Sequence, residues 1–167
     1  FTGLLFYRYA SSERAAYEQR AMTIAQQVMN AIDRDLTGLR TTLQTLSTSA
    51  RLAAGDYRGF HVQSLAVKSF TGADLVLRDV DGQGRVDTRV AQDEPLGRTS
   101  MAVDSLVLAQ HQPVVSDVLA EPSGPYFALM IAVPSAGSAR HFLDVRAPTA
   151  RIAEIIRKDL PEGWVIG

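Results

Sequence analysis

Eight polar side chains within otherwise apolar stretches are the residues of this chain most suited to binding a small molecule. A guanidinium in a pocket holds a carboxylate or a phosphate through two parallel hydrogen bonds. A carboxylate accepts hydrogen bonds from an amine or a hydroxyl. We therefore expect a largely apolar pocket between a sheet face and the segments above it, and the candidate ligand-binding residues are Arg78, Asp87, Arg89, Ser116, Asp117, Tyr126, Asp144 and Arg146.

A second interpretation of the same residues stays open. Charges that alternate along one sheet face are also typical of a solvent-facing surface with cross-strand ion pairs, and this applies to Asp87 with Arg89 and to Asp144 with Arg146. Asp117 equally suits a turn or a cap, and Tyr126 equally suits the core.

The composition excludes several classes of site. The chain has 167 residues and no cysteine, so disulfides, thiolate metal sites and a cysteine nucleophile are excluded. Its 17 basic and 18 acidic residues give a net charge of −1, which does not predict a nucleic-acid partner. The three histidines are far apart in sequence, and we interpret His111 and His141 as surface residues. Since the common catalytic motifs are missing, we predict no enzyme activity for this domain, no cofactor and no metal.

The elements that must position the candidates begin with a long helix. Residues 11–49 contain no proline and one glycine, Gly38. Apolar residues recur there in alternating steps of three and four, which is a heptad pattern. The C-terminal half of this seam is expected to pack inside the domain, and the weaker N-terminal half suits a dimer contact that can shift. The seam consists of Met22, Ala25, Met29, Ile32, Leu36, Leu39, Leu43 and Leu46.

Beyond the long helix, the pattern predicts short helices and strands joined by hairpin-length turns. Asp56 caps a helix that Gly72 ends. Asp81-Gly82 is a hairpin turn. Runs of strands flanked by helices predict an α+β fold, in which a long N-terminal helix packs on one antiparallel sheet of about five strands. The predicted helices are 51–54, 56–70, 104–110 and 148–160, and the predicted strands are 74–79, 84–90, 114–118, 126–133 and 141–147.

The first residues have the composition of a membrane–water boundary. They are apolar and aromatic and end at Tyr7, Arg8 and Tyr9, residue types that are common at that boundary. We interpret them as the outer end of a transmembrane helix, with the start of a soluble amphipathic helix as the alternative. The predicted organisation is 1–10 as that end, 11–50 as the long helix, 51–160 as the module that contains the sheet and 161–167 as the start of a following, truncated module.

The order of these elements and several short strings resemble the CACHE family of bacterial extracytoplasmic sensor domains, which have a PAS-like sheet. The specificity lies in the order of the strings along residues 10–167. They are Gly55-Asp56, the turn at 76–82 with its return strand 86–89, the segment 113–117, Val133-Pro134 and the segment 161–164.

This resemblance implies the extracytoplasmic, ligand-sensing part of a receptor in the inner membrane, most similar to two-component sensor histidine kinases with two stacked CACHE modules. It also implies a small-molecule ligand, an N-terminal membrane anchor and a homodimer formed through the long helix. A diguanylate cyclase or a chemoreceptor is the alternative output, and a periplasmic protein-interaction module without a small ligand is the alternative function. The Arg–Trp–Tyr pattern of the amino-acid-binding subgroup is missing from the strands, so the sequence does not favour an amino-acid ligand.

Overall fold

The computed structural model of the chain describes residues 2–110, 112–135 and 138–160 and divides into two compact units. Leu36–Arg151 form the larger unit, which contains the candidate residues. The other unit consists of Phe1–Asp35 and Ile152–Gly167. No helix in the described part of the chain has a stretch long and apolar enough to cross a bilayer.

The long helix is present, and it begins earlier than the heptad pattern. Helix α1 covers Thr2–Ser47, without the proline that would interrupt its backbone hydrogen bonds. Within the larger unit, Leu39, Leu43 and Leu46 of α1 are buried, as predicted for the C-terminal half of the seam. In the N-terminal half, Met22 and Met29 are exposed. The dimer contact expected for that half stays a prediction.

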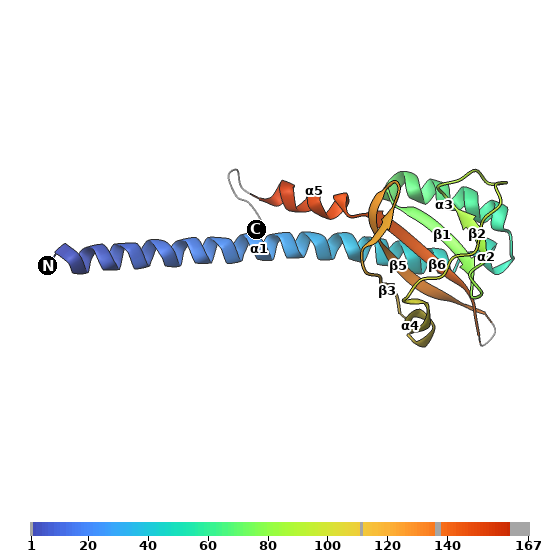
Figure 1. Cartoon of the computed structure of the whole chain (residues 1–167), viewed down its shortest axis with the longest axis horizontal. Helices are drawn as coiled ribbons and strands as arrows, with labels where there is room; N and C mark the ends of the chain where they lie inside the picture. The colour runs from blue at the N-terminus through green and yellow to red at the C-terminus, as the bar shows by residue number, and fades with distance from the viewer. Residues whose placement is uncertain (1, 111, 136–137, 161–167) are drawn as a thin grey trace. The chain divides into compact units, whose positions relative to one another are not determined.

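The described residues form six strands in one antiparallel sheet with the order β2-β1-β6-β5-β3, in which β4 also pairs with β5 (Figure 1). The predicted α+β class is therefore confirmed. The longest strands are central, and the two short strands β3 and β4 share one edge of β5. The strands are β1 Asp74–Asp79, β2 Gly84–Asp87, β3 Val114–Val115, β4 Leu119–Glu121, β5 Gly124–Ser135 and β6 Ser138–Pro148.

Short helices flank this sheet, and local signals set their ends. The Asp56 side chain accepts a hydrogen bond from the Gly59 N–H at 2.8 Å and so caps α3. Gly72 ends α3 in the left-handed conformation, at a φ of 66°, which a glycine adopts without steric cost. The helices are α2 Ala50–Ala53, α3 Tyr57–Thr71, α4 Asp104–Ala109 and α5 Ala150–Asp159.

The two faces of the sheet carry different layers. Because side chains alternate along a strand, Leu75, Leu77, Leu143 and Val145 share one face, and all four are buried. The opposite face carries a separate apolar cluster with α4, and its buried members are Val107, Val114, Ala128, Met130 and Phe142. This second face also carries Arg78, Asp144 and Arg146, because Arg78 pairs with Phe142 and Arg146 pairs with Ala128.

Three local predictions were wrong. Strand β2 ends at Asp87 and does not reach Val90, because the Asp87 carboxylate accepts from the Arg89 N–H and turns the chain. The predicted strand 114–118 stops at Val115, and β4 was missed. His141 is buried between Asp79 and Tyr57 and is not a surface residue, whereas His111 and the predicted truncated module at 161–167 lie outside the described residues.

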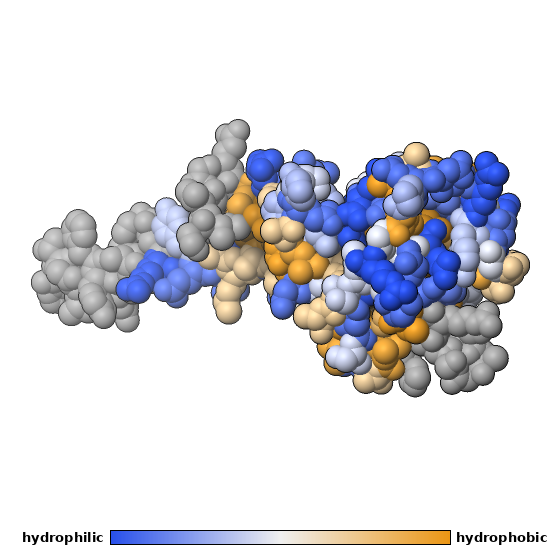
Figure 2. Space-filling view, turned by 45° about the vertical axis from the view of Figure 1, so that its right-hand side comes forward, coloured by the Kyte–Doolittle hydropathy of each residue, from blue (hydrophilic) through white to orange (hydrophobic). Residues whose placement is uncertain are grey.

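Large apolar side chains are also exposed on and after α4. Leu106 and Leu108 belong to α4, and Val115 and Val118 lie in and just after β3. Figure 2 shows apolar atoms on the lower part of this unit, below a cluster of hydrophilic side chains. This surface is the apolar patch of the α4 side.

Candidate functional site

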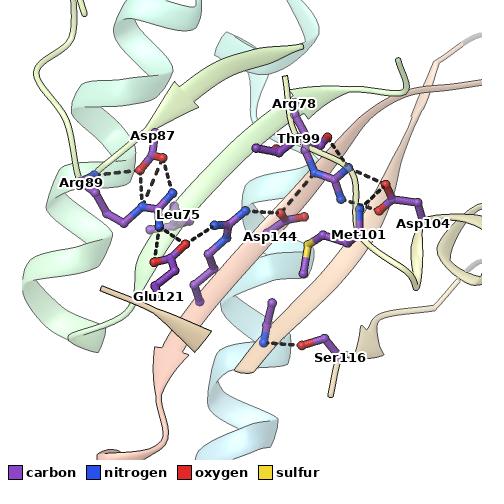
Figure 3. Close-up of polar contacts among 12 residues, drawn as sticks. Leu75, Arg78, Asp87, Arg89, Thr99, Met101, Asp104, Ser116, Glu121 and Asp144 are labelled. Carbon is purple, nitrogen blue, oxygen red and sulfur yellow. Dashed lines mark hydrogen bonds and ion pairs between the residues drawn. The ribbon is translucent and has the colours of Figure 1, made fainter. Parts of the chain in front are cut away.

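The second face of the sheet carries a continuous network of alternating charges, shown in Figure 3. Its order is Asp104, Arg78, Asp144, Arg146, Glu121, Arg89 and Asp87. Strands β1, β2, β4 and β6 contribute to it, together with the first residue of α4 and the turn after β2. The helices α1 and α3 lie behind the sheet in this view, and the network lies in front of it.

Arg78 lies at one end of the network and has no exposed side-chain surface. Its guanidinium donates two hydrogen bonds to the Asp104 carboxylate, at 2.5 and 2.7 Å, in the fork geometry that makes such pairs strong. It also donates to the Thr99 carbonyl and lies 4.5 Å from the centre of the Phe142 ring. Although burial disfavours its charge, Asp104 and Asp144 outweigh burial and raise the pKa of Arg78.

Asp144 is the most deeply buried carboxylate of the network. Its Oδ2 lies 3.5 Å from Arg78 Nε and 3.4 Å from Arg146 Nη2. Its Oδ1 is buried and has no hydrogen-bond partner among the described residues. Burial raises the pKa of Asp144 in spite of the two neighbouring guanidinium groups. This carboxylate can therefore accept a further hydrogen bond, best from a cation, which would also lower its pKa.

Arg146 has an unpaired hydrogen-bond donor, which complements the unpaired acceptor of Asp144. Its Nη1 lies 3.3 Å from the Glu121 carboxylate, and its guanidinium lies 5.3 Å from the centre of the Tyr126 ring. The buried Nε of Arg146 has no acceptor within the described part of the chain. An unpaired donor on Arg146 thus stands two residues from an unpaired acceptor on Asp144, on the same face of β6.

The other end of the network is closed by Arg89. This guanidinium donates to both oxygens of Glu121 at 2.7 Å and to the Asp87 carboxylate at 2.6 Å. Burial opposes ionisation of Asp87, but the hydrogen bonds from the Arg89 side chain and N–H outweigh it and lower the pKa of Asp87. Asp87 is 9% exposed, so it does not lie on a fully solvated face.

Six of the eight candidates lie in this network or against it, and the other two do not. The Ser116 hydroxyl accepts from the Ala128 N–H at 2.9 Å and donates to the Asp117 carbonyl at 2.7 Å, so it fixes the backbone beside β5. The Asp117 side chain is exposed. The six that come together are Arg78, Asp87, Arg89, Tyr126, Asp144 and Arg146.

Two carboxylates of the network were missed in the sequence. Asp104 begins a short helix, and Glu121 precedes Pro122 in a turn-like string, so both positions are typical of caps and turns. Their pairing with Arg78 and Arg146 depends on the path of long loops. The one usable signal was charge balance, because the candidates contain three arginines but, once Asp117 is left out, two carboxylates.

Solved structures show the same fold, although no family model matches the chain and no curated protein matches it. The sensor domain of the V. cholerae histidine kinase DctB is 12% identical, with a TM-score of 0.68 over 83% of this chain and 58% of that one. The ligand-binding domain of the Campylobacter jejuni chemoreceptor Tlp3 in complex with L-valine is 9% identical, with a TM-score of 0.62 over 83% of this chain and 64% of that one. Tlp3 with isoleucine bound gives a TM-score of 0.61 at 10% identity, again over 83% of this chain and 64% of that one.

These matches show that the chain shares the fold of these sensor and ligand-binding domains, in agreement with the fold that the resemblance implied. The chain spans about three fifths of the length of the structures that it matches.

Proposed function

We propose that this chain is the extracytoplasmic sensor portion of a membrane-anchored receptor and binds a small molecule on the charged face of its sheet. The observation that carries the proposal is the pair of unpartnered buried atoms, Asp144 Oδ1 and Arg146 Nε, inside an otherwise saturated network. Buried polar groups are nearly always paired, so an unpaired donor and an unpaired acceptor on one face of β6 call for a further partner, and this supports a ligand there. The domain itself is then a binding module and not an enzyme.

The two unpaired atoms, Asp144 Oδ1 and Arg146 Nε, define the chemistry of the ligand. Asp144 needs a hydrogen-bond donor. An ammonium group would also neutralise the excess negative charge of a network with four carboxylates and three guanidinium groups. Arg146 needs an acceptor, and a carboxylate is the strongest available. A small molecule with both groups, such as an amino acid, satisfies the pair. The amino-acid complexes of Tlp3, a protein of the same fold, support this ligand class.

Binding requires the site to open, because the Arg78 and Asp144 side chains have no exposed surface. The segment that covers Arg78 contains Thr99 and Asp104, and it is held by the ion pair between Arg78 and Asp104. A ligand that reaches this face therefore displaces this segment and moves α4. A ligand that binds one arrangement of this segment better than the other shifts their populations, which is the basis of a sensor.

We further propose that α1 carries this shift to the membrane. The C-terminal part of α1 is fixed to the domain by buried Leu39, Leu43 and Leu46, while Met22 and Met29 are exposed for a partner helix. Small slides of packed helices are a known form of such transmission. The parent protein is then a dimeric receptor of the inner membrane with its sensor in the periplasm, and a histidine kinase is the output that the resemblance favours.

Thermal unfolding with a ligand panel tests the proposal. L-amino acids, small dicarboxylates and amines are added to the purified chain, and a ligand at about 100 times its Kd stabilises the folded state by about 2.7 kcal/mol. For a chain of this size, that corresponds to a rise in Tm of about 5–10 °C.

Matched variants identify the site. Arg146→Gln and Asp144→Asn each remove a charged hydrogen bond to the ligand and should weaken binding at least about tenfold. Asp117→Asn, at an exposed position among the original candidates, should leave binding unchanged. A panel that produces no shift in Tm, or a shift that both Arg146→Gln and Asp144→Asn retain, contradicts ligand sensing at this face.

A protein-interaction module without a small ligand is the second candidate. The apolar patch of the α4 side favours it, because Leu106, Leu108 and Val118 expose 43%, 45% and 64% of their surface. Exposed apolar patches commonly mark binding surfaces. The burial of Arg78 and Asp144 favours the small-molecule function instead, since a partner-binding domain gains nothing from a buried charged network with vacancies. Loss of partner capture in Leu108→Asp, together with no response to the ligand panel, would support this second candidate.

A further inference from the structure

The residue that precedes α5 is held by two hydrogen bonds to a single backbone carbonyl. Thr149 lies between β6 and α5, and both its N–H and its hydroxyl donate to the Pro125 carbonyl oxygen, at 3.1 and 3.3 Å. Pro125 is the second residue of β5, directly after the turn that joins β4 to β5. The position of Thr149 therefore depends on where the β4–β5 hairpin lies.

Strand β4 has little packing of its own to fix this hairpin. It is three residues long, and among the described strands it pairs with β5 alone. Leu119 and Glu121 are half-buried and Ala120 is exposed. A segment with few buried apolar contacts opens more readily than the core of a domain. The hairpin therefore needs side-chain contacts that tie β4 to the rest of the sheet.

Glu121, the last residue of β4, supplies such contacts. Its carboxylate accepts a hydrogen bond from Arg89 on each oxygen at 2.7 Å and lies 3.3 Å from Arg146 Nη1 (Figure 3). Arg89 follows β2 and Arg146 belongs to β6, so Glu121 ties β4 to two other parts of the sheet. This tie lies one residue pair from Pro125 in the hairpin register. It is thus close to the carbonyl that holds Thr149.

The guanidinium of Arg146 is shared between this tie and the ligand of the proposed function. A ligand carboxylate on Arg146 Nε would lie near the Glu121 carboxylate, and like charges at such short range repel each other. Glu121 then keeps its hydrogen bonds from Arg89 and loses its hold on Arg146. The hairpin is in that case no longer tied to β6 through this pair.

We infer that Glu121 couples the charged face to α5, an inference that rests on the proposed function for its ligand. A ligand on Arg146 loosens the hairpin, and the hairpin then loosens its hold on Thr149. A second anchor stays in place, because Arg151 donates to the Thr71 carbonyl at the C-terminal end of α3, where the helix dipole favours a cation. Release of Thr149 therefore lets the start of α5 turn about Arg151, which gives the sensor a second route beside α1.

Hydrogen exchange of the Thr149 amide, followed by nuclear magnetic resonance on the full chain, tests this coupling without any ligand. Glu121→Gln keeps the shape of the side chain and removes its charge, and it should speed the exchange of Thr149 about tenfold or more. Arg89→Gln removes the tie from the other side and should act in the same direction. Asp117→Asn, an exposed carboxylate just before β4, should have no effect. Exchange of the buried Leu77 amide should stay unchanged, which excludes a general loss of stability.

The ligand arm uses L-valine as the first probe. It should speed the exchange of Thr149 severalfold in the wild type, less than Glu121→Gln does because Arg89 still holds Glu121, and it should have no effect in Arg146→Gln.

Unchanged exchange of Thr149 in Glu121→Gln overturns the coupling, whether or not a ligand binds. An amino acid that raises the Tm but leaves the exchange of Thr149 unchanged also overturns it, while ligand binding at the charged face stands. If no amino acid raises the Tm, the proposed function fails, and Glu121→Gln alone then decides whether the hairpin controls the start of α5.

Discussion

Replacement of Asp104 by asparagine removes the ion pair that closes the charged face and leaves the shape of the side chain nearly unchanged. Arg78 then keeps one hydrogen bond to the asparagine amide oxygen, together with the Asp144 carboxylate at 3.5 Å and the Thr99 carbonyl at 3.4 Å. Removal of one partner of a buried pair costs about 3–5 kcal/mol. Because the Asp104 side chain is 20% exposed and asparagine still accepts one hydrogen bond, we expect a loss of about 2–3 kcal/mol.

That loss should lower the Tm by about 5–10 °C at neutral pH, since 1 kcal/mol corresponds to about 2–4 °C for a chain of this size. Thermal and urea unfolding followed by circular dichroism measure it. Asp117→Asn is the matched control, because it removes the same charge from an exposed position.

The pH dependence of the difference gives an independent check. Burial opposes ionisation of Asp104, but hydrogen bonds from Arg78 and the Met101 N–H outweigh it and lower the pKa of Asp104 below 3.8. A carboxyl with a lowered pKa in the folded state contributes stability that is present above its unfolded pKa and is lost as the pH falls through the folded pKa. The free-energy difference between wild type and Asp104→Asn should therefore stay constant above about pH 5 and shrink below about pH 4. A variant as stable as the wild type at pH 7, or a difference that persists at low pH, would refute the assignment of Asp104 as the closing residue.

Three further substitutions probe the fold. Leu43→Ala, at a side chain with 0% exposure, should destabilise the larger unit by about 2–5 kcal/mol in urea unfolding, and an effect below about 1 kcal/mol would mean that α1 is not packed on this domain. Gly82→Ala should destabilise the fold by at least about 1–2 kcal/mol, because Gly82 has a φ of 90° and an added Cβ would lie 2.6 Å from the Thr99 carbonyl oxygen. Gly97→Ala is the control, because Gly97 is exposed and its added Cβ would meet nothing within 4 Å. Met29→Glu should prevent the proposed dimerisation in light-scattering measurements, whereas an unchanged dimer, or a monomeric wild type, would exclude the exposed seam as the contact.

The parts of the fold that the sequence predicted are those set by local chemistry. Asp56 and Gly72 marked the two ends of α3, because a side-chain cap and a left-handed glycine need no distant partner. The strand 74–79 was predicted with its observed bounds. In contrast, β4 was missed because Leu119–Glu121 is stabilised by pairing with β5 next to a turn and has little alternating pattern of its own.

The candidate site could be predicted only where strand alternation fixes a face. The spacing of Asp144 and Arg146 placed them together whatever the register. Their meeting with Arg78 depends on the pairing of Arg78 with Phe142, and a shift of one residue in that pairing would send Arg78 to the opposite face. No periodic pattern encodes such a register, so the sequence could supply the residues of the site but not the contacts between them.

The partners of the arginines explain why an open pocket and a charged surface were both reasonable expectations, and why neither describes this face. An exposed array of ion pairs would contribute little to stability and would leave its charges hydrated. Here Arg78 and Asp144 are fully buried, and a network of this kind is favourable only when its members are satisfied. Asp104 satisfies Arg78 from outside the sheet, while Asp144 Oδ1 and Arg146 Nε stay unpaired. The network is therefore fixed by the Arg78–Asp104 pair at one end, and two of its central atoms are unpaired. A molecule that pairs with Asp144 Oδ1 and Arg146 Nε gains two buried hydrogen bonds while it displaces α4. That combination gives a ligand a preference between two arrangements, which a uniformly saturated network would not provide.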